Sequence, residues 1–164
     1  PISGQCVLDL GAAPGGWSQI AARYVNKGQQ RGQVLAVDIL PINSLSEVDS
    51  MQLDIFQEDS LDLIKAKMIK PEADIILSDM APSTTGHKST DHIRIIALLE
   101  NALDIAENLL ADGGVFVGKV FRGGTESDIL KRMKIKFQNV RHIKPKSSRA
   151  NSTELYVVGL NYRK

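Results

Sequence analysis

Short apolar runs alternate with longer amphipathic stretches along most of the chain. Five runs are apolar at nearly every position, which is typical of strands covered by helices on both faces, and they occupy residues 6–10, 34–40, 51–56, 73–80 and 115–121. Between them, apolar residues recur at three- and four-residue steps and predict helices over 17–25, 59–69, 90–110 and 125–136. Strands that alternate with helices form right-handed crossovers, so the pattern predicts a parallel sheet in an α/β fold.

The end of the chain departs from this alternation. Residues 140–143 and 155–160 have the pattern of two strands without a helix between them, and we expect them to pair antiparallel at the sheet edge through a loop over 144–153. Asp112-Gly113-Gly114 is a typical helix terminator, and Thr125 with Asp128 forms a variant of the capping box. No repeat or linker divides the sequence, so we expect one domain over residues 1–164.

The composition narrows the class of protein. An apolar fraction of 43% with 20 basic and 19 acidic residues is incompatible with intrinsic disorder. The single cysteine, Cys6, excludes an internal disulfide and a cysteine-based zinc site, and we expect a buried strand residue in a reducing, cytoplasmic setting. The three histidines lack metal-ligand spacing, so we expect no metal. No apolar run is long enough for a transmembrane helix, and we expect a monomer without a membrane partner.

The charges are distributed unevenly although they nearly cancel. Residues 38–79 contain ten acidic side chains against three lysines, whereas residues 131–149 contain eight basic side chains and no acidic one. An acidic middle and a basic end suggest two kinds of ligand. The alternative interpretation of the basic run is a solvated helix followed by a charged loop.

A glycine-rich turn follows the first predicted strand directly, with the sequence DLGAAPGGW over residues 9–17. Gly11, Gly15 and Gly16 would let a ligand approach the backbone at the carboxyl end of that strand. The spacing differs from the dinucleotide fingerprint, and no lysine follows as it does in a phosphate-binding loop. The turn therefore disfavours a pyrophosphate or nucleoside triphosphate, although a simple tight turn is the alternative.

Acidic residues mark the ends of the next predicted strands. Asp38 at the second strand is placed to accept hydrogen bonds from ribose hydroxyls, and Asp54 on the third to meet an adenine amino group. Asp79 ends the fourth strand. A ribose, a base and a cationic amino group without phosphate together describe S-adenosylmethionine. Each acid taken alone could be a surface residue, and Trp17 could be a core residue.

Four ordered blocks of this sequence resemble those of one family. The segment DLGAAPGGWSQ at 9–19 is similar to the cofactor motif of the FtsJ/RrmJ (RlmE) family of RNA ribose 2′-O-methyltransferases. SDMAP at 78–82, GKVF at 118–121, and SSRA at 147–150 with ELY at 154–156 match further family blocks in the same order. The resemblance covers essentially the whole chain.

The resemblance implies a class I methyltransferase fold, with a seven-stranded sheet whose last strand is antiparallel. It implies S-adenosylmethionine contacts at Gly15, Trp17, Asp38, Asp54 and Asp79. It also implies a Lys-Asp-Lys-Glu catalytic set, whose last three members match Asp79, Lys119 and Glu154, with Lys119 as the proton acceptor. The substrate it implies is a uridine of large-subunit ribosomal RNA, methylated within the ribosomal particle.

One member of the implied catalytic set has no match. The family's first catalytic lysine lies upstream of the glycine-rich strand, and we expect this chain to lack it because the chain begins after that point. Lys88, after the fourth predicted strand, is more typical of a solvated surface lysine than of a substitute.

Lys119 and its neighbours set the expected chemistry. Lys119 could accept the proton of a ribose 2′-hydroxyl or could stabilise developing oxyanion charge. Lys146 and Arg149, in the basic loop, are candidates for RNA phosphate contacts. Two alternative functions stay open: the same reaction on transfer RNA or an mRNA cap, and a non-catalytic RNA-binding assembly factor that retains the fold.

Overall fold

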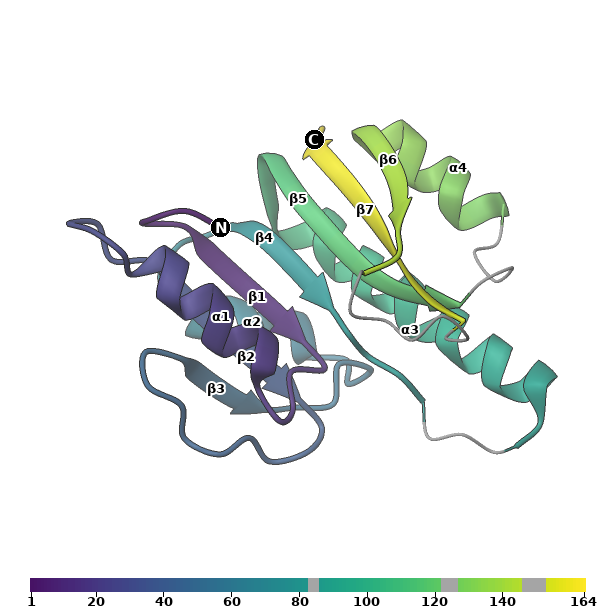
Figure 1. Cartoon of the computed structure of the whole chain (residues 1–164), viewed down its shortest axis with the longest axis horizontal. Coiled ribbons are helices and arrows are strands. Elements are labelled where there is room, and N and C mark those ends of the chain that lie inside the picture. The colour runs from purple at the N-terminus through teal and green to yellow at the C-terminus, as the bar shows by residue number, and fades with distance from the viewer. Residues whose placement is uncertain (83–85, 122–126, 146–152) are drawn as a thin grey trace.

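The computed structural model describes the chain except for residues 83–85, 122–126 and 146–152. Within the described residues, a seven-stranded sheet has the order β3-β2-β1-β4-β5-β7-β6 (Figure 1). Its strands are β1 (Cys6–Leu10), β2 (Gln33–Asp38), β3 (Asp49–Gln52), β4 (Ala73–Ser78), β5 (Leu110–Phe121), β6 (Phe137–Ile143) and β7 (Glu154–Tyr162). The helices are α1 (Gly16–Val25), α2 (Ser60–Lys67), α3 (Lys88–Leu109) and α4 (Ser127–Lys136).

The strand directions confirm the predicted mostly parallel sheet. β1 pairs parallel with β2 and β4, and the parallel pairing continues from β2 to β3 and from β4 to β5. β7 runs antiparallel between β5 and β6. The antiparallel pairing predicted for the last two segments is therefore confirmed. This arrangement needs no crossover helix between the two strands.

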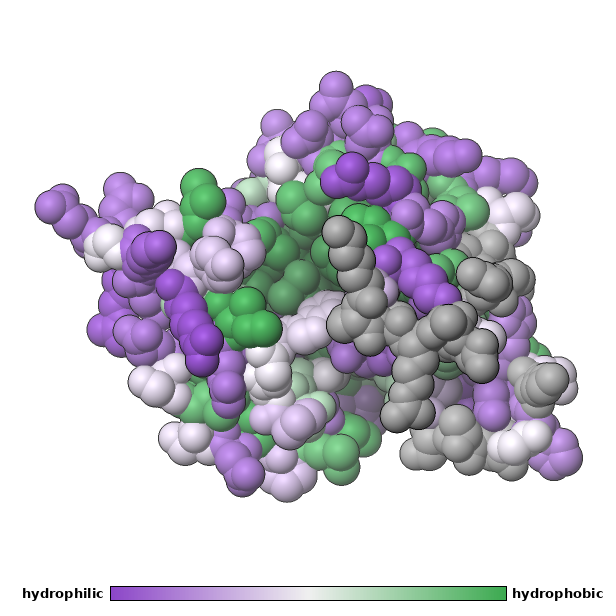
Figure 2. Space-filling view, in the orientation of Figure 1, coloured by the Kyte–Doolittle hydropathy of each residue, from purple (hydrophilic) through white to green (hydrophobic). Residues whose placement is uncertain are grey.

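The two faces of the sheet are covered unequally. Because side chains alternate along a strand, Leu8 on β1 joins the larger core with α2, α3 and α4, whereas Val7 joins a smaller core with α1. On the α1 face, an apolar hollow of about 270 Å³ lies beside that helix, lined in part by Ile20, Ile75 and Leu77 (Figure 2). Among the described residues, no helix combines the length and the apolar character needed to cross a bilayer.

The third strand differs from its prediction. The pattern predicted residues 51–56, but β3 ends at Gln52 and most of its side chains are exposed, because it forms the edge of the sheet. Leu53 and Ile55 supply the apolar signal from the turn that follows, where they pack into the larger core. Asp54 therefore lies beyond β3 and not on it, which corrects the prediction.

The longest helix also ends earlier than the sequence suggested. α3 ends at Leu109 and β5 begins at the next residue, so the predicted terminator Asp112-Gly113-Gly114 lies inside β5. Gly113 has a φ of +78°, close to an irregularity in the β4–β5 register. The glycine allows the backbone conformation at that irregularity and does not end the helix. The helix begins at Lys88, two residues before its predicted start. Thr125 of the predicted capping box lies outside the described residues.

Candidate active site

The glycine-rich turn carries the chain from β1 into α1 and needs its glycines for different reasons. Gly11 has a φ of +73°, and a Cβ there would lie 2.4 Å from Met80 Cγ. Gly15 has a φ of +115°, and its Cβ would lie 2.3 Å from Leu45 Cδ1. Both positions favour glycine for backbone conformation and packing. Only Gly16, with nothing within 4 Å of its Cβ position, fits the expectation of an open approach for a ligand.

Two cavities adjoin this turn at the carboxyl edge of the sheet. The larger, of about 480 Å³, is lined by Asp38 and Asp54 among apolar side chains that include Ile39, Phe56 and Leu98. The smaller, of about 170 Å³, is lined by Asp9, Gly16 and Trp17. Gly11, Ala13 and Asp79 line both cavities, so the turn separates two neighbouring compartments of different polarity.

Asp38 ties the turn to the end of β2. Its Oδ2 accepts a hydrogen bond of 2.8 Å from the Ala13 backbone N–H, and its Oδ1 accepts one of 2.8 Å from Leu40. A carboxylate oxygen can accept a second hydrogen bond, so both oxygens keep capacity for a ligand hydroxyl. Asp54 accepts a hydrogen bond of 3.0 Å from the Phe56 N–H and also lines the larger cavity. The two acids thus lie in one compartment, although Asp54 reaches it from a turn.

Asp9 is a site residue that sequence reasoning did not select. It is fully buried at the end of β1, and its Oδ2 accepts a hydrogen bond of 2.6 Å from the Ser18 hydroxyl. Its other oxygen, Oδ1, is buried and has no hydrogen-bond partner among the described residues. Burial raises the pKa of Asp9 to about 6. An acid inside an apolar strand was the available signal, because such a group needs a partner.

Three predicted catalytic residues meet above the ends of β4, β5 and β7. Lys119 Nζ lies 3.0 Å from Asp79 Oδ1 and 3.7 Å from Glu154 Oε1. The lysine side chain is only 10% exposed, whereas those of Asp79 and Glu154 are 33% and 42% exposed. A largely buried amine with two carboxylates can hold or move a proton next to Asp79, which lines the smaller cavity.

The sheet register explains this meeting. Asp79 follows Ser78, which pairs with Gly118 on β5, and Glu154 pairs with Phe121. β5 continues two residues beyond Lys119, to Phe121. Lys119 therefore projects from within a paired strand, which restricts its position more than a strand end would.

Tyr156 is a second residue whose place in the site the sequence did not reveal. It pairs with Lys119 in the register, and its hydroxyl donates a hydrogen bond of 2.7 Å to Asp79 Oδ1. Its ring packs against Trp17, with the ring centroids 5.2 Å apart. Burial, with the adjacent Asp79 carboxylate, raises the pKa of Tyr156 above its usual value. Trp17 thus links the glycine-rich turn to the Asp79–Lys119 pair through Tyr156.

The basic run at the end of the chain is partly committed to internal ion pairs. Lys131 Nζ lies 3.1 Å from Asp128, and Arg132 binds Asp104 and Glu107 of α3 at 2.5 and 2.7 Å. These two basic residues favour the structural interpretation of their part of the run. The candidate RNA contacts Lys146 and Arg149 lie outside the described residues, as does the side chain of Lys88.

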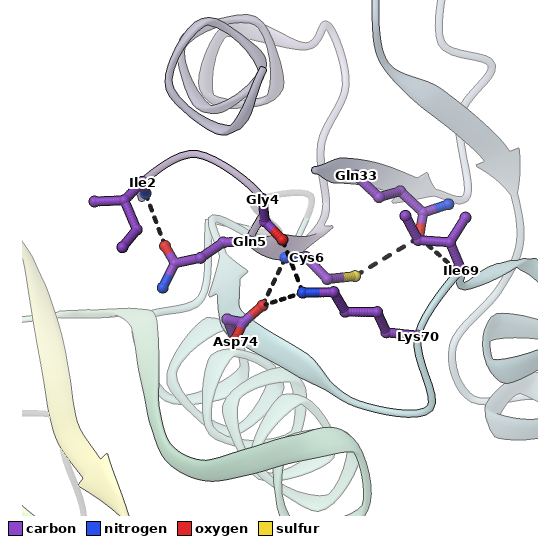
Figure 3. Close-up of polar contacts among 8 residues, drawn as sticks. All are labelled: Ile2, Gly4, Gln5, Cys6, Gln33, Ile69, Lys70 and Asp74. Carbon is purple, nitrogen blue, oxygen red and sulfur yellow. Dashed lines mark hydrogen bonds and ion pairs between the residues drawn. The ribbon is translucent and has the colours of Figure 1, made fainter. Parts of the chain in front are cut away.

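A network of hydrogen bonds surrounds the only cysteine at the amino-terminal end of β1, away from the glycine-rich turn (Figure 3). The Cys6 N–H donates to Asp74 Oδ2 at 2.7 Å, and Lys70 Nζ donates to the Gly4 carbonyl at 2.7 Å. Cys6 itself is fully buried, and burial raises its thiol pKa to about 11. Because a thiol attacks as the thiolate, this residue is a poor nucleophile, and the predicted burial of Cys6 is confirmed.

Comparison with known proteins identifies the family. The sequence model of the FtsJ-like methyltransferase family matches residues 2–162. Two relatives are named ribosomal RNA large subunit methyltransferase E. The one from Azorhizobium caulinodans is 46% identical over 160 residues, which cover 98% of this chain and 66% of the relative. The one from Rickettsia bellii is 47% identical over 157 residues, which cover 94% and 69%.

The chain therefore spans about two thirds of the length of these relatives. Among solved structures, a protein described as a ribosomal RNA methyltransferase from Plasmodium falciparum matches with a TM-score of 0.83 at 26% identity. That match covers 98% of this chain and 87% of the other. The family match, the relatives and the class I methyltransferase architecture agree, and the chain belongs to the FtsJ-like methyltransferase family.

Proposed function

We propose that the protein transfers a methyl group from S-adenosylmethionine to the ribose 2′-hydroxyl of a uridine in large-subunit ribosomal RNA. The observation that carries the proposal is the placement of Lys119 between Asp79 and Glu154, since Asp79 also lines the smaller cavity beside the glycine-rich turn. The names of the relatives support the ribosomal substrate. Because the chain spans about two thirds of the length of those relatives, methyl transfer to ribosomal RNA is proposed for the full-length protein.

The two cavities fit the parts of S-adenosylmethionine. In the larger, Asp38 would accept the ribose hydroxyls and Asp54 the adenine amino group, between apolar walls. In the smaller, Asp9 would accept a hydrogen bond from the α-amino group, since its buried Oδ1 has no partner among the described residues. When bound, the cofactor supplies an electrophilic methyl group on a sulfonium.

The chain's own residues would orient and deprotonate the acceptor. In this proposal Lys119 contacts the 2′-hydroxyl, holds it in line with the methyl group and takes its proton. Asp79 and Glu154 hold the amine in place, because both lie within ion-pair distance. Trp17 and Tyr156 close the side of the site next to α1, where their rings contact each other.

The RNA partner is expected to bind through the basic end of the chain. Lys146 and Arg149 would contact phosphates, since such contacts position the RNA without reading its sequence. A cytoplasmic location and a monomeric state belong to the same proposal. Both rest on the sequence alone.

The test is methyl transfer from labelled cofactor to purified large ribosomal subunits, with transfer RNA and capped mRNA as competing substrates. We expect label in the ribosomal RNA, and mapping should place it on the 2′-oxygen of a uridine. Transfer to transfer RNA or to the cap alone would overturn the ribosomal substrate. Binding to subunits without transfer to any RNA would favour an assembly factor that retains the fold.

A further inference from the structure

Lys119 faces an electrostatic problem if it is to accept a proton. Its amine lies 3.0 Å from Asp79 Oδ1 and 3.7 Å from Glu154 Oε1, and both carboxylates favour the charged ammonium. A charged ammonium has no lone pair with which to take the hydroxyl proton. A site that uses this lysine as a base therefore needs something that weakens the pull of the carboxylates.

A second hydrogen-bond donor to Asp79 can weaken the attraction between this carboxylate and Lys119. The Tyr156 hydroxyl donates at 2.7 Å to Asp79 Oδ1, the same oxygen that contacts Lys119 Nζ. We propose that Tyr156 is a positioning residue that fixes Asp79 Oδ1 beside Lys119 and, through this oxygen, favours the neutral form of the lysine. The inference rests on the proposed methyl transfer and deepens it by naming what prepares the proton acceptor.

The local structure holds the tyrosine in the geometry that this role needs. Tyr156 and Lys119 are register partners on adjacent strands, so their side chains leave the same face of the sheet at the same level. The Trp17 ring, 5.2 Å away, restricts the tyrosine ring. The raised pKa of Tyr156 keeps its hydroxyl protonated across the working pH range, so it remains a donor.

The hydrogen bond from Tyr156 lowers the effective negative charge on the shared oxygen, Asp79 Oδ1. A donor on Oδ1 neutralises part of the carboxylate charge, and the remaining charge attracts the Lys119 ammonium less strongly. Among the described residues, Glu154 on β7 also lies near Lys119, and Asp9 on β1 interacts electrostatically with Asp79. Both are negative when ionised and favour the ammonium, whereas the Tyr156 hydrogen bond has the opposite effect.

Tyr156→Phe isolates the hydroxyl because phenylalanine keeps the ring contact with Trp17. The matched control is Tyr162→Phe on the same strand, where the hydroxyl instead donates at 3.0 Å to the Glu107 carbonyl on the far side of the sheet. Both variants and the wild type are compared in the presence of S-adenosylmethionine. Calorimetry of cofactor binding and thermal melting verify that each variant is folded.

The first measurement is an NMR titration of the Lys119 side-chain amine, which needs no turnover. We expect the amine of Tyr156→Phe to titrate at higher pH than that of the wild type, and that of Tyr162→Phe to coincide with the wild type. The second measurement is kcat against pH on large ribosomal subunits. We expect kcat at neutral pH to fall about three- to tenfold in Tyr156→Phe, with its rising limb displaced to higher pH and with KM for the cofactor unchanged.

An unchanged titration of Lys119 in Tyr156→Phe would overturn the inference. An equal shift in Tyr162→Phe would overturn it too, because the effect would then be a general consequence of losing a tyrosine hydroxyl. A wild type that titrates normally but methylates no RNA would instead count against the proposed function. The titration therefore separates the failure of the inference from the failure of the function.

Discussion

Single carboxylate oxygens define the site at the scale of the residue. Asp79 Oδ1 is shared by Tyr156 and Lys119, whereas Asp9 Oδ1 is buried without a partner among the described residues. The first oxygen contacts two donors, and the second belongs to a residue that lines the smaller cavity. In the proposed function the two residues have separate roles: Asp79 would organise the reacting groups, and Asp9 would accept a hydrogen bond from the cofactor.

The burial of Asp9 makes stability depend on pH. Its pKa is about 6 in the folded protein against an ordinary 3.8, so the unfolded state releases this proton first as the pH rises. The contribution of Asp9 to stability is therefore complete below about pH 4 and is lost as the pH rises through about 6. Relative to Asp9→Asn, which does not titrate, we expect the wild type to lose about 3 kcal/mol of unfolding free energy across that window.

Urea denaturation of both proteins without cofactor, at several pH values from 4 to 7, measures this difference. A difference that does not vary with pH would show that Asp9 ionises normally in the folded chain. Adding cofactor should diminish the pH dependence in the wild type, since a cationic amino group beside Asp9 favours the carboxylate.

Asp38 offers a direct test of cofactor binding. Its oxygens already accept two backbone hydrogen bonds, and the cofactor ribose would add to them. We expect Asp38→Ala to weaken S-adenosylmethionine binding by about 1–3 kcal/mol in calorimetry. Asp62→Ala, on the exposed surface of α2, is the matched control and should bind normally. Equal affinities in both variants would remove Asp38 from the cofactor site.

At the scale of the element, the glycines of the turn between β1 and α1 have different roles: one allows the backbone conformation, and another leaves space for a ligand. Gly11 needs its positive φ and its close approach to Met80, whereas Gly16 begins α1 with open space above it. We expect Gly11→Ala to lower the unfolding free energy by about 1–3 kcal/mol. Gly16→Ala should stay within about 1 kcal/mol of the wild type and should instead weaken cofactor binding.

Denaturation and calorimetry on the two variants check both expectations. If Gly16→Ala binds cofactor as well as the wild type does, the ligand does not approach the backbone there. If Gly11→Ala is as stable as the wild type, the turn can adopt another conformation without cost.

The strands show where the sequence pattern was sufficient to predict secondary structure. Buried strands such as β1 and β4 are apolar on both faces, so their runs predicted them closely, and the alternation with helices predicted the parallel sheet. The edge strand β3 was misplaced because its own residues are polar and its apolar neighbours belong to a turn. Local pattern cannot separate a half-covered edge strand from the apolar turn beside it.

The site was partly predictable for a similar reason. Asp79, Lys119 and Glu154 could be selected from motif resemblance, and the structure brings their side chains together. The hydrogen bond of Tyr156 to Asp79 joins residues 77 positions apart and depends on the β5–β7 register, which no local pattern encodes. The burial of Asp9 depends likewise on how tightly β1 is covered by the rest of the fold.

At the scale of the whole molecule, the proposed reaction requires the cofactor cavities and a bound RNA to meet at Lys119. Lys131 and Arg132, in the described part of the basic run, bind acidic neighbours. We expect RNA affinity to depend on the basic loop that follows. We expect charge reversal at Lys146 and Arg149 to weaken RNA binding and to reduce the salt slope by about one for each lost phosphate contact.

Binding titrations at several salt concentrations measure that slope. Lys131→Glu is the control, because its partner is Asp128 in the same helix. A slope that stays the same after reversal of both loop residues would make the loop a solvated face without a role in RNA binding.

The most direct test of the account is the Lys119→Ala variant of the whole protein, assayed with labelled cofactor on large ribosomal subunits. In the proposed reaction Lys119 contacts the acceptor hydroxyl, and it does not line either cavity beside the glycine-rich turn, so its loss should affect turnover and leave cofactor affinity unchanged. We expect the methylation rate to fall by about two to four orders of magnitude while calorimetry gives the wild-type Kd, with exposed Lys134→Ala on α4 as the unaffected control. A Lys119→Ala variant that methylates at the wild-type rate would contradict the account.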